Sequence, residues 1–176
     1  MHSLRASLAA ALTAIIALSG CASYTPQNAE RAEVPMRDVM GRDLGTLTLS
    51  NTTGGLMLTG VVRGLPPGTH GIHVHATGRC EAPFASAGSH WNPMGRMHGT
   101  QNAQGPHLGD MPNIVVGPDS SATVSVISSG GTLRGTDRLL DADGAAVVIH
   151  AVADDYRTDP SGNSGSRVAC GVVRAD

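Results

Sequence analysis

Histidine is concentrated in one part of this chain. The sequence has eight histidines, and all of them except His2 fall between His70 and His150. Histidines used only for packing or solvation would be scattered more evenly. Because imidazole is a common metal ligand, the concentration predicts a metal centre assembled from several segments.

His73 and His75 belong to the run HGIHVH (70–75). Side chains two positions apart on a strand point to the same face, with Cα atoms about 6.6 Å apart. Two such rings can lean together and share one ion through bonds of about 2 Å. His70 has the opposite parity, so we expect it to be a structural hydrogen-bonding residue. A hydrogen-bonded surface pair is the alternative explanation of a His-x-His run.

Three histidines and a carboxylate follow in a glycine-rich stretch, namely His90, His98, His107 and Asp110. They offer three nitrogens and one oxygen, a complete tetrahedral set that suits a structural zinc because it leaves no open position. Solvent-exposed loop histidines and an ordinary turn aspartate are the alternative. His150 follows an apolar run (145–149), so a buried strand would present it at the mouth of the domain.

The elements that position these residues are predicted to be short β-strands. No segment shows sustained helical periodicity, whereas β-rich runs alternate with Gly, Pro, Asn and Asp. This pattern is typical of an all-β sandwich or barrel. Stretches 77–112 and 153–167 are too long for hairpin turns, and long ordered loops are usually functional. The expected strands are Asp43–Ser50, Leu56–Arg63, His70–Ala76, Ala122–Ile127, Ala145–Ala151 and Val168–Arg174, with another within Glu33–Met40.

The N-terminus predicts export. Residues 1–20 read as a signal peptide, with a positive start at Arg5 and an apolar run that is shorter than the roughly 20 residues of a membrane-spanning helix. The run ends in LSGC (18–21), which looks like a bacterial lipobox. We therefore expect Cys21 to be lipidated, and the protein to be anchored to a membrane in the cell envelope or periplasm of a bacterium. Ordinary secretory cleavage near Ala22 is the alternative.

Three cysteines are an awkward number for an exported protein. If Cys21 takes lipid, Cys80 and Cys170 remain, and an oxidising compartment allows them to pair. Two separate buried thiols are the alternative. Residues 21–32 are polar and are expected to form a flexible tether, followed by a single domain over 33–176.

The composition limits the classes of partner. The formal net charge is −2, so no broad basic face is available for nucleic acid. Aromatic residues make up only 2% of the chain, so the core must be built from aliphatic residues and methionine.

The histidine-bearing segments together resemble the bacterial, exported branch of the copper/zinc superoxide dismutases. Every ligand position of that family's pattern is filled in order, and weaker agreement extends from about Glu33 onward. The matching segments are GTHGIHVHATGRC (68–80), ASAGSHWNPMGRMHG (85–99), GPHLGDMPN (105–113), VVIHAVADD (147–155) and GNSGSRVACGVV (162–173).

The resemblance implies a role for each of these residues. His90 would bridge the two metals, and Asp154 would tie a copper-ligand histidine, His73, to a zinc-ligand histidine, His98. Cys80 and Cys170 would form a disulfide. The copper ligands would be His73, His75, His90 and His150, and the zinc ligands His90, His98, His107 and Asp110.

The resemblance also implies the fold and the activity. The fold would be an antiparallel Greek-key β-barrel of immunoglobulin-like sandwich architecture, with both metals held outside it by the two long loops. Copper cycling between Cu(II) and Cu(I) would convert superoxide to oxygen and hydrogen peroxide, beside a structural zinc. Arg167 would attract and orient the superoxide anion, and His90 would carry a proton.

The departures from the family pattern are modest. Ile72, Ala76 and Thr77 differ from residues common at these positions, but no ligand differs. The lysines that steer substrate in some members are absent, so Arg157 and Arg79 are candidates to replace them.

Alternative functions stay open at the level of sequence. The chain could be a copper-binding or copper-buffering lipoprotein without turnover, a zinc-stabilised structural module, or an inactive relative that binds a partner. The complete ligand set and Arg167 favour the enzyme, because an inactive relative would be free to lose them. Carriers of Cu(I) more often use clustered Met or Cys ligands. Both a monomer and a homodimer are compatible with the sequence.

Overall fold

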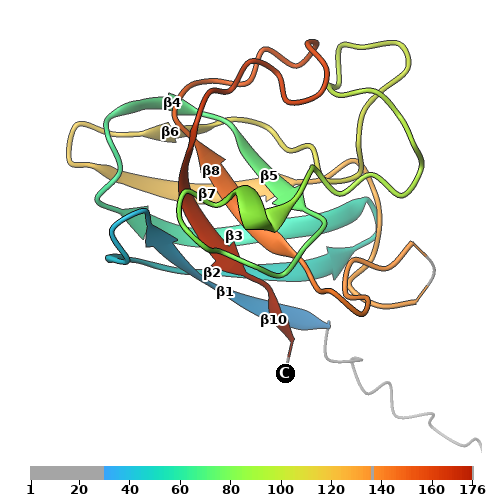
Figure 1. Cartoon of the computed structure of the whole chain (residues 1–176), viewed down its shortest axis with the longest axis horizontal. Helices are drawn as coiled ribbons and strands as arrows, with labels where there is room; N and C mark the ends of the chain where they lie inside the picture. Colours follow the sequence, from blue (N-terminus) through green and yellow to red (C-terminus); the bar gives the residue numbers. More distant parts are fainter. Residues whose placement is uncertain (1–29, 136, 176) are drawn as a thin grey trace, which may run out of the picture.

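The computed structural model describes residues 30–135 and 137–175, which are built almost entirely of antiparallel strands (Figure 1). The main sheet is curled and has the strand order β5-β8-β9-β1-β2-β3-β7, with β10 beside β1, while β4 and β6 form a two-stranded sheet. This confirms the predicted all-β fold class. The elements are β1 (Arg31–Asp38), β2 (Asp43–Thr52), β3 (Gly55–Arg63), β4 (Gly68–His70), β5 (Ile72–His75), the short 3₁₀ helix η1 (Ala85–Ala87), β6 (Ile114–Val116), β7 (Ser121–Ile127), β8 (Ala146–His150), β9 (Arg167–Val172) and β10 (Arg174–Ala175).

Apolar and polar side chains alternate along the strands, and the apolar ones form the core. Along β1, Val34 and Met36 are fully buried, whereas Glu33 and Arg37 are exposed. The other core strands contribute mainly Leu, Ile and Val, as the composition predicted. Full burial of one such side chain stabilises the fold by about 1.5–3 kcal/mol.

Strands β5 and β8 separate the core from the histidine face. They pair antiparallel, with Ile72 opposite Ile149. Ile72 and Val74 point into the core, so period-two alternation sends His73 and His75 to the outer face. His150 ends β8 with the parity opposite to that of Ile149, and therefore also lies outside the barrel.

Most strand predictions are confirmed to within two residues at each end. The predicted strand His70–Ala76 is wrong as one element, because Gly71 divides it into β4 and β5. The Gly71 amide donates to Val152 O and its carbonyl accepts from His150 N, so this residue turns toward β8 instead of continuing the strand. Strands β6 and β10 were not predicted.

The N-terminal expectations fall largely outside the described residues. These expectations are the signal peptide over 1–20, lipidated Cys21 and most of the tether. Strand β1 begins at Arg31, inside the stretch expected to be tether, and Ala32 is 1% exposed. The ordered domain therefore begins before the expected boundary at Glu33. Among the helices of the described residues, none is long and apolar enough to cross a bilayer.

Of the two long loops, the second and the yellow-green part of the first lie together at the top of Figure 1, whereas η1 in the first loop lies nearer the middle. They follow β5 and β8, and the only regular element in either is η1. Main-chain contacts join them, since Gln101 N donates to Tyr156 O over 3.0 Å. These are the two stretches that the sequence predicted to be functional.

Candidate metal centre

The first long loop returns along the edge of β5. The amide of Val74 donates to Gly109 O over 2.9 Å, and its carbonyl accepts from Trp91 N over 2.8 Å. These bonds place His90, which precedes Trp91, and Asp110, which follows Gly109, beside the strand. The sheet edge thereby brings distant loop ligands to the histidine face.

Four histidines converge outside β5 and β8. One ligand nitrogen from each lies within 4.8 Å of the others, and all four side chains are buried. They come from three separate segments of the chain, two on β5, one on the first loop and one at the end of β8. The group is His73, His75, His90 and His150.

Backbone carbonyls fix the tautomers of two of these rings. Nδ1 of His75 donates to Gly88 O over 3.0 Å, and Nδ1 of His150 donates to Gly165 O over 3.3 Å. A neutral imidazole that donates from Nδ1 keeps a lone pair on Nε2. Both rings therefore present an unprotonated Nε2 to the centre of the group.

One ring nitrogen of each of the four histidines lacks a hydrogen-bond partner. These atoms, Nδ1 of His73 and Nε2 of His75, His90 and His150, are the only such buried side-chain nitrogens or oxygens in the described part of the chain. Buried polar atoms are otherwise satisfied in folded proteins, so four convergent exceptions require an explanation. A cation bound at their centre would satisfy all four.

Burial keeps three of these rings neutral, those of His75, His90 and His150. Desolvation is the main cause that lowers the pKa of His90 to about 4 and that of His150 to about 3, and it lowers the pKa of His75 well below its usual value. Neighbouring histidines add to the effect. At neutral pH these three rings hold the deprotonated form that a metal ion needs.

A second group surrounds the carboxylate of Asp110. Its Oδ1 lies 2.9 Å from His90 Nδ1, 3.1 Å from His98 Nδ1 and 3.2 Å from His107 Nδ1. The Nδ1 atoms of His90 and His107 are 3.4 Å apart. Tetrahedral ligands with bonds of about 2.0–2.1 Å are about 3.3 Å apart, so these four atoms fit around one zinc-sized ion. His90 belongs to both groups.

Asp154 connects the two groups. Its Oδ2 accepts from His73 Nε2 over 2.7 Å, and its Oδ1 lies 3.0 Å from His98 Nε2. Burial lowers the pKa of His98, but contacts with Asp110 and Asp154 outweigh it and raise the pKa to about 9. A proton on His98 therefore competes with a cation for the same Nδ1.

Two residues that sequence reasoning missed support Asp154. Asn113 donates from Nδ2 to Asp154 O and accepts at Oδ1 from Asp154 N, each over 2.9 Å. Gly162 has φ +63°, and a Cβ there would meet the Asp154 carboxylate and His98 Nε2. Both residues fall in segments that the sequence singled out, but nothing local distinguishes them from other loop residues.

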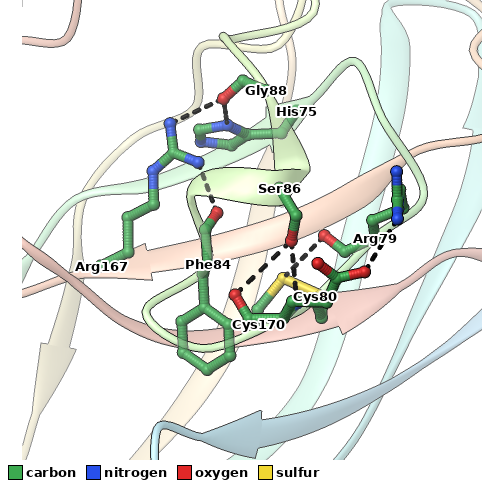
Figure 2. The surroundings of a disulfide bond; sticks show 9 residues. His75, Arg79, Cys80, Phe84, Ser86, Gly88, Arg167 and Cys170 are labelled. Carbon is green, nitrogen blue, oxygen red and sulfur yellow. Dashed lines mark hydrogen bonds and ion pairs between the residues drawn. A yellow bond between two sulfur atoms is a disulfide. The ribbon is translucent and has the colours of Figure 1, made fainter.

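Arg167 lies at the opening of the first group. Its Nη1 donates to Phe84 O and its Nη2 to Gly88 O, each over 2.6 Å, as Figure 2 shows. With His90 and His150 it lines a cavity of about 360 Å³. Arg157 and Arg79 do not line this cavity.

The predicted disulfide is confirmed. Cys80 and Cys170 are bonded, with Cα atoms 5.7 Å apart, and the bond fastens the start of the first loop to β9 beside Arg167 (Figure 2). His70 hydrogen-bonds, as predicted, with its Nδ1 2.7 Å from His150 O. Arg79 pairs instead with Glu81, over 2.9 Å on the surface.

Comparisons with known proteins agree with this geometry. Residues 44–173 match the family model described as copper/zinc superoxide dismutase (SODC). A curated "Superoxide dismutase [Cu-Zn] 2" of Aquifex aeolicus is 39% identical over 148 residues, covering 82% of this chain and 86% of the relative. A "Superoxide dismutase [Cu-Zn]" of Caulobacter vibrioides is 40% identical over 139 residues, covering 76% of this chain and 80% of the relative.

A solved structure shows the same architecture. The crystal structure of a SOD-like protein from Bacillus subtilis has a TM-score of 0.76 and 36% identity, and the match covers 80% of this chain and 96% of that one. The curled antiparallel sheet is therefore the Greek-key barrel expected from the sequence. From its family match, its relatives and its fold, this chain belongs to the copper/zinc superoxide dismutase family.

Proposed function

We propose that this protein dismutates superoxide with a copper ion held by His73, His75, His90 and His150 and a zinc ion held by His90, His98, His107 and Asp110. The observation that carries the proposal is the set of four buried, unpartnered ring nitrogens that converge outside β5 and β8. The family match to copper/zinc superoxide dismutases supports the choice of both metals.

Bound copper would supply one-electron chemistry, in which one superoxide is oxidised to oxygen and a second is reduced to hydrogen peroxide. The protein residues supply position, charge and protons. Neutral His75 and His150 present unprotonated Nε2 atoms, and Asp154 holds His73 through Nε2. Four nitrogens suit copper, whereas three nitrogens and a carboxylate oxygen suit zinc.

His90 is proposed to bridge the two metals and to carry one of the two protons that peroxide needs. Its Nδ1 faces Asp110 in the second group, while its Nε2 is free of protein partners. Whenever it is not bound to copper, Nε2 can therefore take up a proton and donate it to the reduced anion. The second group holds the ring in place from the other side during that transfer.

Arg167 is proposed to bind the anion. The guanidinium is held by two carbonyl dipoles, and no carboxylate of the described residues forms an ion pair with it. Its positive charge is thus available to a small anion that enters the cavity shared with His90 and His150. Arg167→Ala should keep both metals, lower turnover by about tenfold and flatten its dependence on ionic strength.

Metal analysis of the purified protein, combined with a superoxide assay, tests the whole assignment. His75→Ala and His107→Ala form a matched pair, because each removes one buried histidine from a different group. His75→Ala should lose copper and all activity while keeping zinc. His107→Ala should lose zinc before it loses copper. A wild-type protein that binds both metals but removes superoxide no faster than buffer would be a copper-buffering protein, and the proposal would be wrong.

We also propose export and anchoring through lipid on Cys21, on the sequence LSGC (18–21). Wild-type protein should then incorporate labelled fatty acid and appear in membrane fractions of the cell envelope. Cys21→Ala should lose both properties while the domain still folds. Membrane association that survives Cys21→Ala would contradict the anchor.

A further inference from the structure

Phe84 stands out in the first long loop. It is the only phenylalanine of the chain, it is 3% exposed, and its backbone has φ +73°. A positive φ is unfavourable for residues other than glycine, above all for bulky ones, and it persists only where the surroundings enforce it. The backbone conformation therefore requires a strong anchor at this position.

The anchor is a small apolar cluster outside the barrel. The Phe84 ring packs there with Ala146 and Val148 of β8 and with Cys170 of β9, and Cys80 packs against the same cluster. Alternation on β8 places this cluster on the strand face that also carries His150. The ring thus contacts the strands that hold the metal-centre residues, close to the disulfide shown in Figure 2.

The Phe84 carbonyl points the other way, toward the guanidinium of Arg167 (Figure 2). It accepts from Arg167 Nη1 over 2.6 Å, and Gly88, which ends the same short helical segment, accepts from Nη2. The Gly88 carbonyl also accepts from His75 Nδ1. The segment from Phe84 to Gly88 therefore sets the place of the guanidinium relative to the first histidine group.

We propose that Phe84 is a positioning residue for Arg167, because its buried ring fixes the peptide carbonyl that holds the guanidinium at the opening of the metal centre. The inference rests on the proposed role of Arg167 as the group that binds the anion. Removal of the ring would release the segment 84–88, so that the guanidinium would lose a fixed partner and sample other positions.

Azide, a small monoanion, tests the proposal with the copper- and zinc-loaded full chain. Its dissociation constant is measured from the copper absorption spectrum, so this readout does not depend on turnover. Because only part of the loss of this hydrogen bond reaches the anion, we expect azide binding to be about three- to tenfold weaker in Phe84→Ala. The modification rate of Arg167 by phenylglyoxal, followed by peptide mass spectrometry, should rise in the same variant.

Three variants separate positioning from general destabilisation. Phe84→Leu keeps apolar bulk and should restore most of the azide affinity. Phe84→Gly relaxes the positive φ, which offsets part of the lost packing, but it should still bind azide weakly because the ring is absent. Leu58→Ala truncates an equally buried side chain on β3, in the main core, and should leave azide affinity unchanged.

Wild-type azide affinity in both Phe84→Ala and Phe84→Gly would overturn the proposal. So would an equal loss of affinity in Leu58→Ala, since the effect would then report stability alone. Absence of superoxide removal by the wild-type protein, with the azide and phenylglyoxal results as expected, would refute the proposed function and leave the role of Phe84 standing.

Discussion

Removal of the Cys80–Cys170 disulfide should cost this domain a large part of its stability. The bond joins residues 90 positions apart. In the chain-entropy model, closing a loop of that length destabilises the unfolded chain by about 4.6 kcal/mol. Domains of this size have total unfolding free energies of about 5–15 kcal/mol. The bond therefore accounts for about 30% or more of the stability of the metal-free protein.

The assay is urea unfolding of metal-free protein, since bound metals would add a stabilisation of their own. With a slope of about 2 kcal/mol per M, the full entropic term lowers the midpoint by about 2 M. Cys80→Ala, Cys170→Ala and the double variant should all lose about the same amount, because each opens the same loop. Reduced wild-type protein should match them.

Two results would refute this reasoning. One is a double variant whose midpoint stays within about 0.3 M of the oxidised wild type. The other is a double variant that loses the sum of the two single losses, since the cost would then come from side-chain packing at each position. Loss of the disulfide should also affect anion binding. Because the bond fastens the loop whose carbonyls hold Arg167, metal-loaded variants should also bind azide more weakly.

Three further changes have defined outcomes. Asp154→Asn removes the carboxylate that faces His73 and His98, and should weaken zinc binding about 10–100-fold, as a metal-competition titration would measure; unchanged affinity would contradict the link. Gly162→Ala places a Cβ against the same carboxylate at φ +63° and should also release zinc, whereas Gly95→Ala, also at positive φ but with open space around its Cβ, should not. In metal-free protein the folded-state pKa values of His90 (about 4) and His150 (about 3) lie below the unfolded value near 6.5. Between these values the unfolded chain binds more protons than the folded one. The stability of metal-free protein should therefore fall as the pH is lowered from 6.5, by up to about 1.4 kcal/mol per pH unit for each histidine. The pKa of His98, raised to about 9, acts in the opposite sense, and its contribution to stability is lost as the pH rises from 6.5 toward 9. Urea midpoints that increase as the pH is lowered from 6.5 to 4 would contradict the effect assigned to His90 and His150.

Residue type and spacing were enough to predict the local pattern. Alternation in the run from Ile72 to His75 was enough to predict two histidines on one face, because side-chain direction in a strand depends only on neighbouring positions. Apolar runs bounded by turn residues were likewise enough to predict β2, β3, β7, β8 and β9. The ligand types were also readable, since three histidines and an aspartate define a donor set wherever they meet.

Which distant segments meet is known only from the folded chain. The edge of β5 receives the first loop through main-chain bonds of Val74, and these bonds leave no signature in the sequence around that residue. Gly71 divides the expected strand because its amide and carbonyl bond residues about 80 positions away. Asn113, Gly162 and Phe84 act through contacts across loops, so their roles were hidden. Local order follows from residue type and spacing, whereas the geometry of the metal centre follows from long-range hydrogen bonds and packing that form only in the folded chain.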